Sequence, residues 1–123
     1  MLLDTAVLIS ATAPEGVTGA ISVASIAELH FGVLVAATPD ERARRLQRLG
    51  VIEATFDPLP VDADVAREWG RLSAAVKDRG GQPRKRAVDL VIAATANVNG
   101  VRLLTPNQSD FRIISDLVDV REP

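Results

Sequence analysis

The stretch that decides the fold is residues 1–9, MLLDTAVLI. Its two leucines predict a short buried strand, and the residues that follow the aspartate predict the opening of a helix. Asp4 stands where the strand passes into the helix. In open parallel sheets, functional groups collect beyond the carboxyl ends of the strands. Asp4 is therefore the first candidate for a functional residue.

The same alternation of short apolar segments with helical patterns continues along the chain. Further strands are predicted at 20–22, 58–61, 101–104 and 117–120, with a loop at 105–110 and a turn at Pro14-Glu15-Gly16. Helices are predicted at 23–37, 39–49, 65–77 and 85–97. Short strands that alternate with helices predict an α/β fold with a parallel sheet and right-handed crossovers.

Three of the predicted helix ends carry explicit signals. Thr38 precedes a proline and suits the N-cap position, because its hydroxyl can accept from a free N–H of the first turn. Asp62 or Asp64 caps the next helix. Gly80-Gly81 predicts that helix's C-terminal end.

Composition limits the chemistry that the chain can perform. Its 123 residues make one domain's worth of sequence, and we expect residues 1–123 to form a single domain. The absence of cysteine excludes disulfides, thiolate nucleophiles and Cys-ligated zinc. One histidine and no tyrosine exclude a nuclease that uses a histidine pair or a tyrosyl adduct within one chain. Phosphodiester chemistry would therefore depend on carboxylates.

Charge and hydropathy suggest location and partners. The net charge is −2, so contact with a polyanion requires a local basic patch or a bound cation. The N-terminus has no basic region before its apolar residues, and no stretch reaches the ~20 apolar residues that cross a bilayer. We expect a cytoplasmic protein that does not engage a membrane.

Four acidic residues from distant parts of the chain are candidate neighbours: Asp4, Glu28, Asp89 and Asp110. Asp4 ends the first strand, and Asp110 lies in the loop after the fourth. Glu28 and Asp89 stand near the starts of predicted helices that could bring them to the same edge. Like charges that converge in this way need a cation.

Each acid also has a structural explanation. Asp4 could simply cap the first helix. Glu28 stands three residues after Ser25, so the two could form a capping box. Asp110 and Asn107 could satisfy their own backbone through Asx turns.

Asp89 is harder to explain structurally. Its apolar neighbours place it on a largely buried helix, where an unpaired carboxylate would cost several kcal/mol. Interaction with the helix N-terminus is the competing account, and it contributes only about 0.3–1 kcal/mol at an exposed site. The pattern favours a ligand role for Asp89.

Several basic and aromatic residues can be interpreted either as functional or as structural. Arg84-Lys85-Arg86 directly precedes the helix of Asp89, so it could contact phosphates there or could be a solvated stretch. Trp69 fits a core or interface anchor better than a base-stacking platform. His30 points away from Glu28 on its helix and is interpreted as a surface or packing residue.

Four blocks in order carry a family resemblance: Met1-Leu2-Leu3-Asp4-Thr5, Ala27-Glu28-Leu29 with Gly32, residues 88–96 (VDLVIAATA), and Leu103-Leu104-Thr105-Pro106-Asn107 with Asp110-Phe111. Together they resemble the PIN domain, and specifically the VapC-type toxins of bacterial toxin–antitoxin pairs. The resemblance spans the whole chain. No single block is specific for this family, but the order and separations of the four blocks in a chain of this length are specific for it.

The resemblance implies a three-layer α/β/α sandwich with a five-stranded parallel sheet. It also implies an endoribonuclease dependent on Mg²⁺ or Mn²⁺, which forms a homodimer and is inhibited by a VapB-type antitoxin that itself binds DNA. A metal-activated water would then hydrolyse the RNA phosphodiester.

Site residues are carried over from the resemblance position by position. Asp4, Glu28, Asp89 and Asp110 become the catalytic and metal-binding quartet, and Thr5, Thr105 and Asn107 give polar support. The block Arg84-Lys85-Arg86 is more basic than the resemblance leads us to expect, which leaves substrate preference open.

Two other functions fit parts of the pattern. A non-catalytic PIN-like binding module could use the acidic cluster to dock a basic partner segment. A haloacid-dehalogenase-like phosphatase would use Asp4 as nucleophile, but it needs a second aspartate where Ala6 stands. The sequence favours the nuclease over both.

Overall fold

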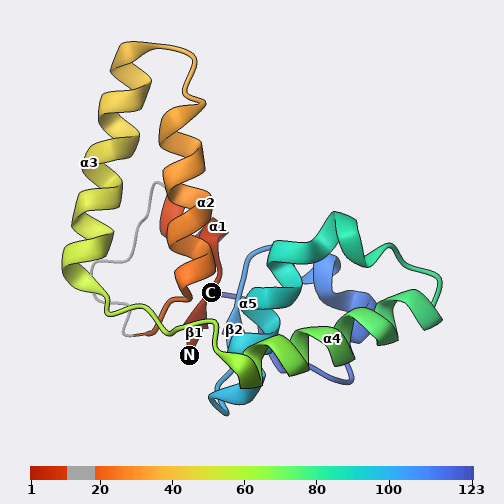
Figure 1. The fold of residues 1–123 in the computed structure, drawn as a ribbon. Helices are drawn as coiled ribbons and strands as arrows, with labels where there is room; N and C mark the ends of the chain where they lie inside the picture. The colour runs from red at the N-terminus through yellow and green to blue at the C-terminus, as the bar shows by residue number, and fades with distance from the viewer. Residues whose placement is uncertain (11–18) are drawn as a thin grey trace.

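The computed structural model describes residues 1–10 and 19–123, and the turn predicted at Pro14-Glu15-Gly16 lies outside them. The elements in chain order are β1 (Leu2–Leu3), α1 (Thr5–Ile9), α2 (Val23–Leu34), α3 (Pro39–Thr55), α4 (Ala63–Asp78), the 3-10 helix η1 (Pro83–Arg86), α5 (Ala87–Val98), β2 (Leu103–Leu104), the 3-10 helix η2 (Gln108–Ile114) and β3 (Val120–Arg121). Figure 1 shows two helix pairs, α2 with α3 and α4 with α5, on either side of the short strands.

Three two-residue strands form a parallel sheet in the order β1-β2-β3. Leu2 pairs with Leu103 and Leu3 with Leu104, while β3 pairs with the other edge of β2. The α/β class is therefore confirmed. The predicted number of five strands is wrong for the part of the chain that the structure describes.

Two predicted strands are reduced to single parallel bridges, one joining Ala20 to β1 and one joining Ser22 to Leu59. Ser22 is already the N-cap of α2, so the chain turns into helix directly after its bridge. Leu59 lies between Pro58 and Pro60, and proline has no N–H to extend a ladder. The first segment therefore runs beside β1 and the second beside the first, and neither becomes a regular strand.

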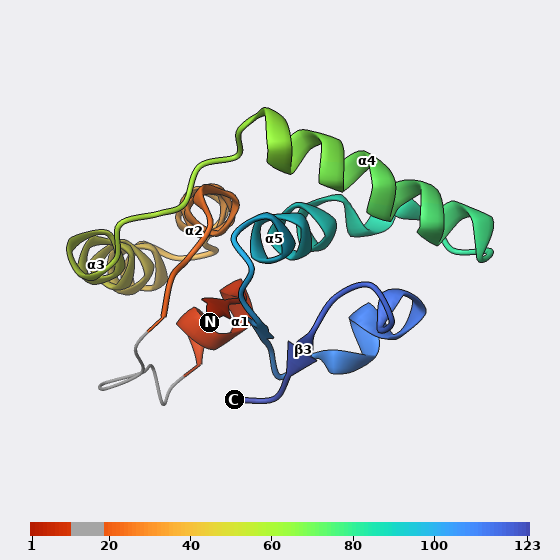
Figure 2. The ribbon, with the colours of Figure 1, turned by 90° about the horizontal axis from the view of Figure 1, so that it is seen from below.

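The strands feed two apolar cores. Because successive strand residues point to opposite faces, Leu2 and Leu103 enter one core, with residues of α4, α5 and η2. Leu3 and Leu104 enter the other, with residues of α1, α2 and α3. Apolar side chains thus cover both faces of the sheet. Figure 2 shows the two helix pairs from below, with the strands beneath α5.

Most predicted helices form, but several ends differ. α2 ends at Leu34 and not at Ala37, because the chain must turn before the cap at Thr38. α3 continues past the predicted end at Leu49 to Thr55. Leu49 and Ile52 pack in the same core, and this packing outweighs the weak helix propensity of the glycine between them.

The capping signals are confirmed. The Thr38 hydroxyl accepts from the N–H of Glu41 at 3.1 Å, and Asp62, not Asp64, caps α4 by accepting from Val65 N–H at 2.9 Å. α4 ends as predicted, with Gly80 at a φ of +85°, a left-handed conformation that favours glycine.

The C-terminal third departs most from the prediction. Residues 83–86 form η1, so α5 begins at Ala87 and not at Lys85. The predicted loop at 105–110 runs into η2, and the last strand is Val120–Arg121 in place of 117–120. Among the described residues, no helix is long and apolar enough to cross a membrane.

Candidate functional site

Asp4 closes β1 and opens α1. Its N–H donates to the carbonyl of Leu104 at 2.9 Å, which fixes it at the end of the paired strands. One carboxylate oxygen accepts from the N–H of Thr5 and the other from the hydroxyl of Thr105, both at 2.8 Å. Asp4 is buried, and Thr105 is fully enclosed. The capping explanation of Asp4 is therefore confirmed, and the same carboxylate also lies at the ends of the paired strands, where a functional role stays a prediction.

The surroundings of Asp4 shift its pKa in opposite directions. Burial raises the pKa of Asp4, the hydrogen bonds from Thr105 and from the Thr5 N–H lower it, and the charge of Asp110 raises it further. The donors hold the two oxygens in fixed directions. A nearby cation would favour the charged form of a buried carboxylate that has a like-charged neighbour.

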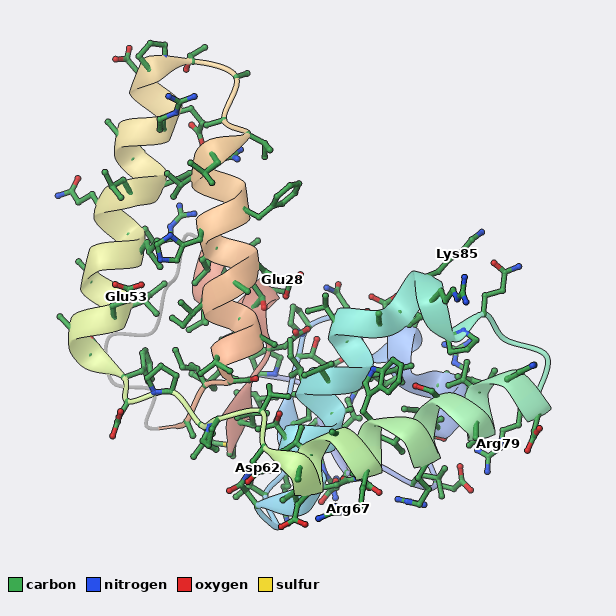
Figure 3. The ribbon with its side chains drawn as sticks, viewed as in Figure 1. Glu28, Glu53, Asp62, Arg67, Arg79 and Lys85 are labelled. Atoms are coloured by element: carbon green, nitrogen blue, oxygen red, sulfur yellow. The ribbon has the colours of Figure 1, made fainter. Side chains whose placement is uncertain are left out.

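Glu28 comes from the second turn of α2, on the side that faces α5 in Figure 3. The Thr5 hydroxyl donates to a carboxylate oxygen of Glu28 at 2.6 Å and lies 3.0 Å from the hydroxyl of Ser25. The N-cap of α2 is Ser22, whose hydroxyl accepts from the N–H of Ala24. The capping-box explanation of Glu28 and Ser25 is therefore wrong, and Glu28 is joined to the residue after Asp4.

Asp89 lies in the first turn of α5 with about a third of its side chain exposed. Burial together with the charges of Asp4, Asp110 and Glu28 raises the pKa of Asp89 to about 6, although the Arg86 charge lowers it. Asp89 therefore interacts electrostatically with all three of the other predicted acids. The structure thus places the other three carboxylates near enough to act on the charge of Asp89, and Asp110 near enough to act on that of Asp4.

Asp110 belongs to η2 and not to a loop. Its N–H donates to the carbonyl of Asn107, and the N–H of Asn107 donates to the hydroxyl of Thr105, each at 3.0 Å. The Asn107 side chain makes no capping bond to η2, so it does not form the alternative Asx turn. Thr105 thus links the backbone before η2 to the carboxylate of Asp4.

The three basic residues before α5 differ in direction. Lys85 extends into solvent in Figure 3, and Arg84 is likewise exposed. The Arg86 guanidinium instead reaches the acids, with Nη1 at 3.0 Å from Asp110 Oδ1 and 3.7 Å from Asp89 Oδ2. One of the three therefore lies among the acids, and the other two are exposed beside it in the sequence.

The donor set suits a hard divalent cation, because Mg²⁺ and Mn²⁺ prefer carboxylate oxygens. As the side chains stand, no three His, Cys, Asp or Glu residues within 1–10 and 19–123 are placed to hold an ion together. Asp89 and Asp110 are turned toward Arg86, and Glu28 is bonded to Thr5. The chemistry of the donors fits the cation, and rotation of these side chains would have to bring them together.

The sequence missed two features of this region. Ser25, which the sequence offered only as a possible cap, is fully buried beside Thr5, and the signal for this was its position one helical turn before Glu28. An apolar groove of about 520 Å³ also runs beside Glu28, lined by Phe31, Trp69 and neighbouring residues of α2 and α5. Trp69 is partly buried against the core and donates to a carbonyl of α5, which confirms an anchoring role.

Comparison with known proteins gives a consistent result. A family model described as PIN domain matches residues 1–117. Ribonuclease VapC5 of Mycobacterium tuberculosis is 38% identical over 97% of this chain and 90% of its own length. The solved VapBC-5 toxin–antitoxin structure from that organism is 37% identical, with a TM-score of 0.81 over 98% of this chain and 94% of the other.

A more distant structure shows the same fold. VapBC2 from Rickettsia felis, bound to a DNA fragment from its promoter, has a TM-score of 0.78 at 21% identity. It covers 99% of this chain and 97% of its own.

Proposed function

Because this chain belongs to the PIN-domain family, we propose that it is a metal-dependent endoribonuclease and the toxin of a toxin–antitoxin pair. The observation that carries the catalytic part is the environment of Asp89. Burial and three neighbouring carboxylates raise the pKa of Asp89 to about 6, which is the signature of acids gathered at one site. The position of Asp4 after β1, bonded to the end of β2, supports the proposal, because open parallel sheets carry their functional groups at these ends.

Asp4, Glu28, Asp89 and Asp110 would hold Mg²⁺ or Mn²⁺, which proteins bind through a few carboxylates while the ion keeps several waters. When bound, the cation supplies an activated water and neutralises charge on the phosphoryl oxygens.

The chain's own hydroxyls orient these ligands. Thr105 donates to Asp4 and accepts from the Asn107 N–H, so its proton can only point toward the carboxylate. The Thr5 hydroxyl likewise donates to the carboxylate of Glu28. Hydrogen bonds of this kind fix the direction of ligand oxygens, and their loss typically costs about 10–100-fold in metal affinity or activity.

RNA contact would come from the basic residues at the edge of the cluster. Arg84 and Lys85 are exposed directly before α5, close in sequence to Asp89. They could neutralise backbone phosphates while the metal holds the scissile one. This arrangement explains how a chain with a net charge of −2 can bind a polyanion.

The partner would be a VapB-type antitoxin, and contact with DNA would be made through that antitoxin. The solved relatives that carry this fold are toxin–antitoxin complexes, which supports the assignment. Homodimerisation is proposed from the resemblance alone, and light scattering on the purified chain would test it. A small reading frame for a DNA-binding protein just upstream of this gene would support the pairing.

The test replaces Asp4 and Asp89 separately by asparagine and measures RNA cleavage with Mg²⁺ or Mn²⁺. Asparagine keeps the size of each side chain but removes its charge, so both variants should lose most activity. Asp57→Asn, an exposed acid outside the cluster, is the matched control and should cleave like the wild type. Full activity in both cluster variants would sink the catalytic proposal.

EDTA separates the proposed nuclease from a non-catalytic docking module. Chelation should abolish cleavage if the acids act through a metal. A docking module would show no metal-dependent cleavage at all and would hold a basic partner segment equally well with EDTA present.

A further inference from the structure

The Arg86 side chain occupies the place between two of the proposed metal ligands. Its Nη1 atom lies 3.0 Å from Asp110 Oδ1 and 3.7 Å from Asp89 Oδ2. Asp110 belongs to η2 and Asp89 to α5, so one guanidinium lies between two different elements. Its positive charge lowers the pKa of Asp89 against the combined effect of burial and three acids.

Helix stability does not explain this position. Arg86 is the N-cap residue of α5 and makes no side-chain capping bond there. A positive charge at a helix N-terminus is unfavourable, because the free N–H groups already carry partial positive charge. The acids are therefore what holds the guanidinium in place.

We propose that Arg86 is a built-in cation that competes with the divalent metal for Asp89 and Asp110. The proposal rests on the metal site put forward above. A guanidinium and a metal ion cannot both lie between the same two carboxylates, so metal entry requires the Arg86 side chain to swing out. This exchange is possible because nearly half of the Arg86 side chain is exposed and its stem is flexible.

The competition has a functional consequence. Without a counter-charge, the converging carboxylates would repel one another. Arg86 neutralises part of this charge and raises the metal concentration that the site needs. It would thus set the threshold at which the nuclease becomes competent.

The experiment measures Mn²⁺ binding to the full chain at pH 7.5 by titration calorimetry and by loss of the free Mn²⁺ paramagnetic resonance signal. Arg86→Gln should bind Mn²⁺ about fivefold more tightly or better, the lower end of typical coupling between two sites. Arg86→Lys keeps the charge, so its affinity for Mn²⁺ should be closer to that of the wild type. Arg67→Gln, which removes an exposed arginine paired with Asp64 on α4, should not differ from the wild type.

The outcomes separate the two proposals. If the wild type binds Mn²⁺ and Arg86→Gln binds it with equal or lower affinity, the proposed competition is overturned. No Mn²⁺ binding by the wild type or by any variant overturns the metal site itself, and the competition with it.

A second readout covers a loss of structure in the variant. Arg86→Gln should melt at a lower temperature than the wild type in EDTA, because its acids lose their counter-charge. The same excess of Mn²⁺ should then raise its melting temperature more than that of the wild type, since the stabilisation by a ligand grows with the logarithm of its affinity for the folded chain. Equal increments in the two proteins would contradict the competition.

Discussion

Replacing Asp89 by asparagine should make the metal-free protein more stable while it removes activity. The wild-type carboxyl must be charged at neutral pH in a place where burial and three other acids raise its pKa from 3.8 to about 6. A rise of this size corresponds to a penalty of about 3 kcal/mol in the folded state. About a third of the side chain is exposed, so solvent screening reduces the expected gain to about 1–2 kcal/mol.

The assay is thermal unfolding in EDTA followed by circular dichroism between pH 4 and 8. At pH 7.5 the Asp89→Asn variant should melt about 4–8 °C above the wild type, given a domain of this size. The folded-state pKa of Asp89 is raised, so the penalty is full above about 6 and disappears as pH falls toward 3.8. The advantage of the variant should therefore shrink steadily between pH 7 and pH 4.

A matched control isolates the cluster. Asp57→Asn changes the same atoms at an exposed position, and its melting temperature should match the wild type at every pH. An Asp89→Asn variant that melts no higher than the wild type at pH 7.5 would refute the electrostatic reasoning. An advantage that persists undiminished at pH 4 would refute it as well.

Two further predictions concern support and packing. Thr105→Val removes the donor to Asp4 and should lower RNA cleavage by about 10–100-fold with little change in fold, as judged from initial rates beside the circular dichroism spectrum. Gly81→Ala should destabilise the chain by about 1–3 kcal/mol in urea unfolding, because a Cβ there would meet Val76 Cγ1 at 2.7 Å. Gly70→Ala meets nothing within 4 Å in α4 and should instead stabilise by about 0.5–1 kcal/mol; a loss at Gly70 as large as at Gly81 would contradict the packing argument.

The sequence predicted the elements that local signals determine. Thr38, Asp62 and the glycines after α4 act within a few residues of themselves, and each lies where the pattern placed it. The end of α3 was missed because it depends on the core that Leu49 and Ile52 share with α2. The strand count was wrong for a similar reason, since an apolar run says nothing of whether its N–H groups meet a partner.

The candidate acids could be found from the sequence because their positions after strands and at helix starts are visible in it. Their mutual arrangement could not be found that way. Glu28 alone fitted a capping box, and only the fold shows that the cap is Ser22 and that Thr5 bonds to Glu28. The direction of Arg86 was equally hidden, because three consecutive basic residues look alike until the turn of η1 separates them.

Asp4 is both a helix cap and a member of the acidic cluster. Asparagine and serine cap helices about as well as aspartate, so folding alone would let mutation exchange them freely at this position. Only the charge distinguishes aspartate from its neutral substitutes. In a lineage without selection for nuclease activity, asparagine could replace aspartate at position 4 while the helix persisted. Under the metal-binding role proposed for Asp4, the identity of that single side chain would separate descendants that keep the activity from those that keep only the fold.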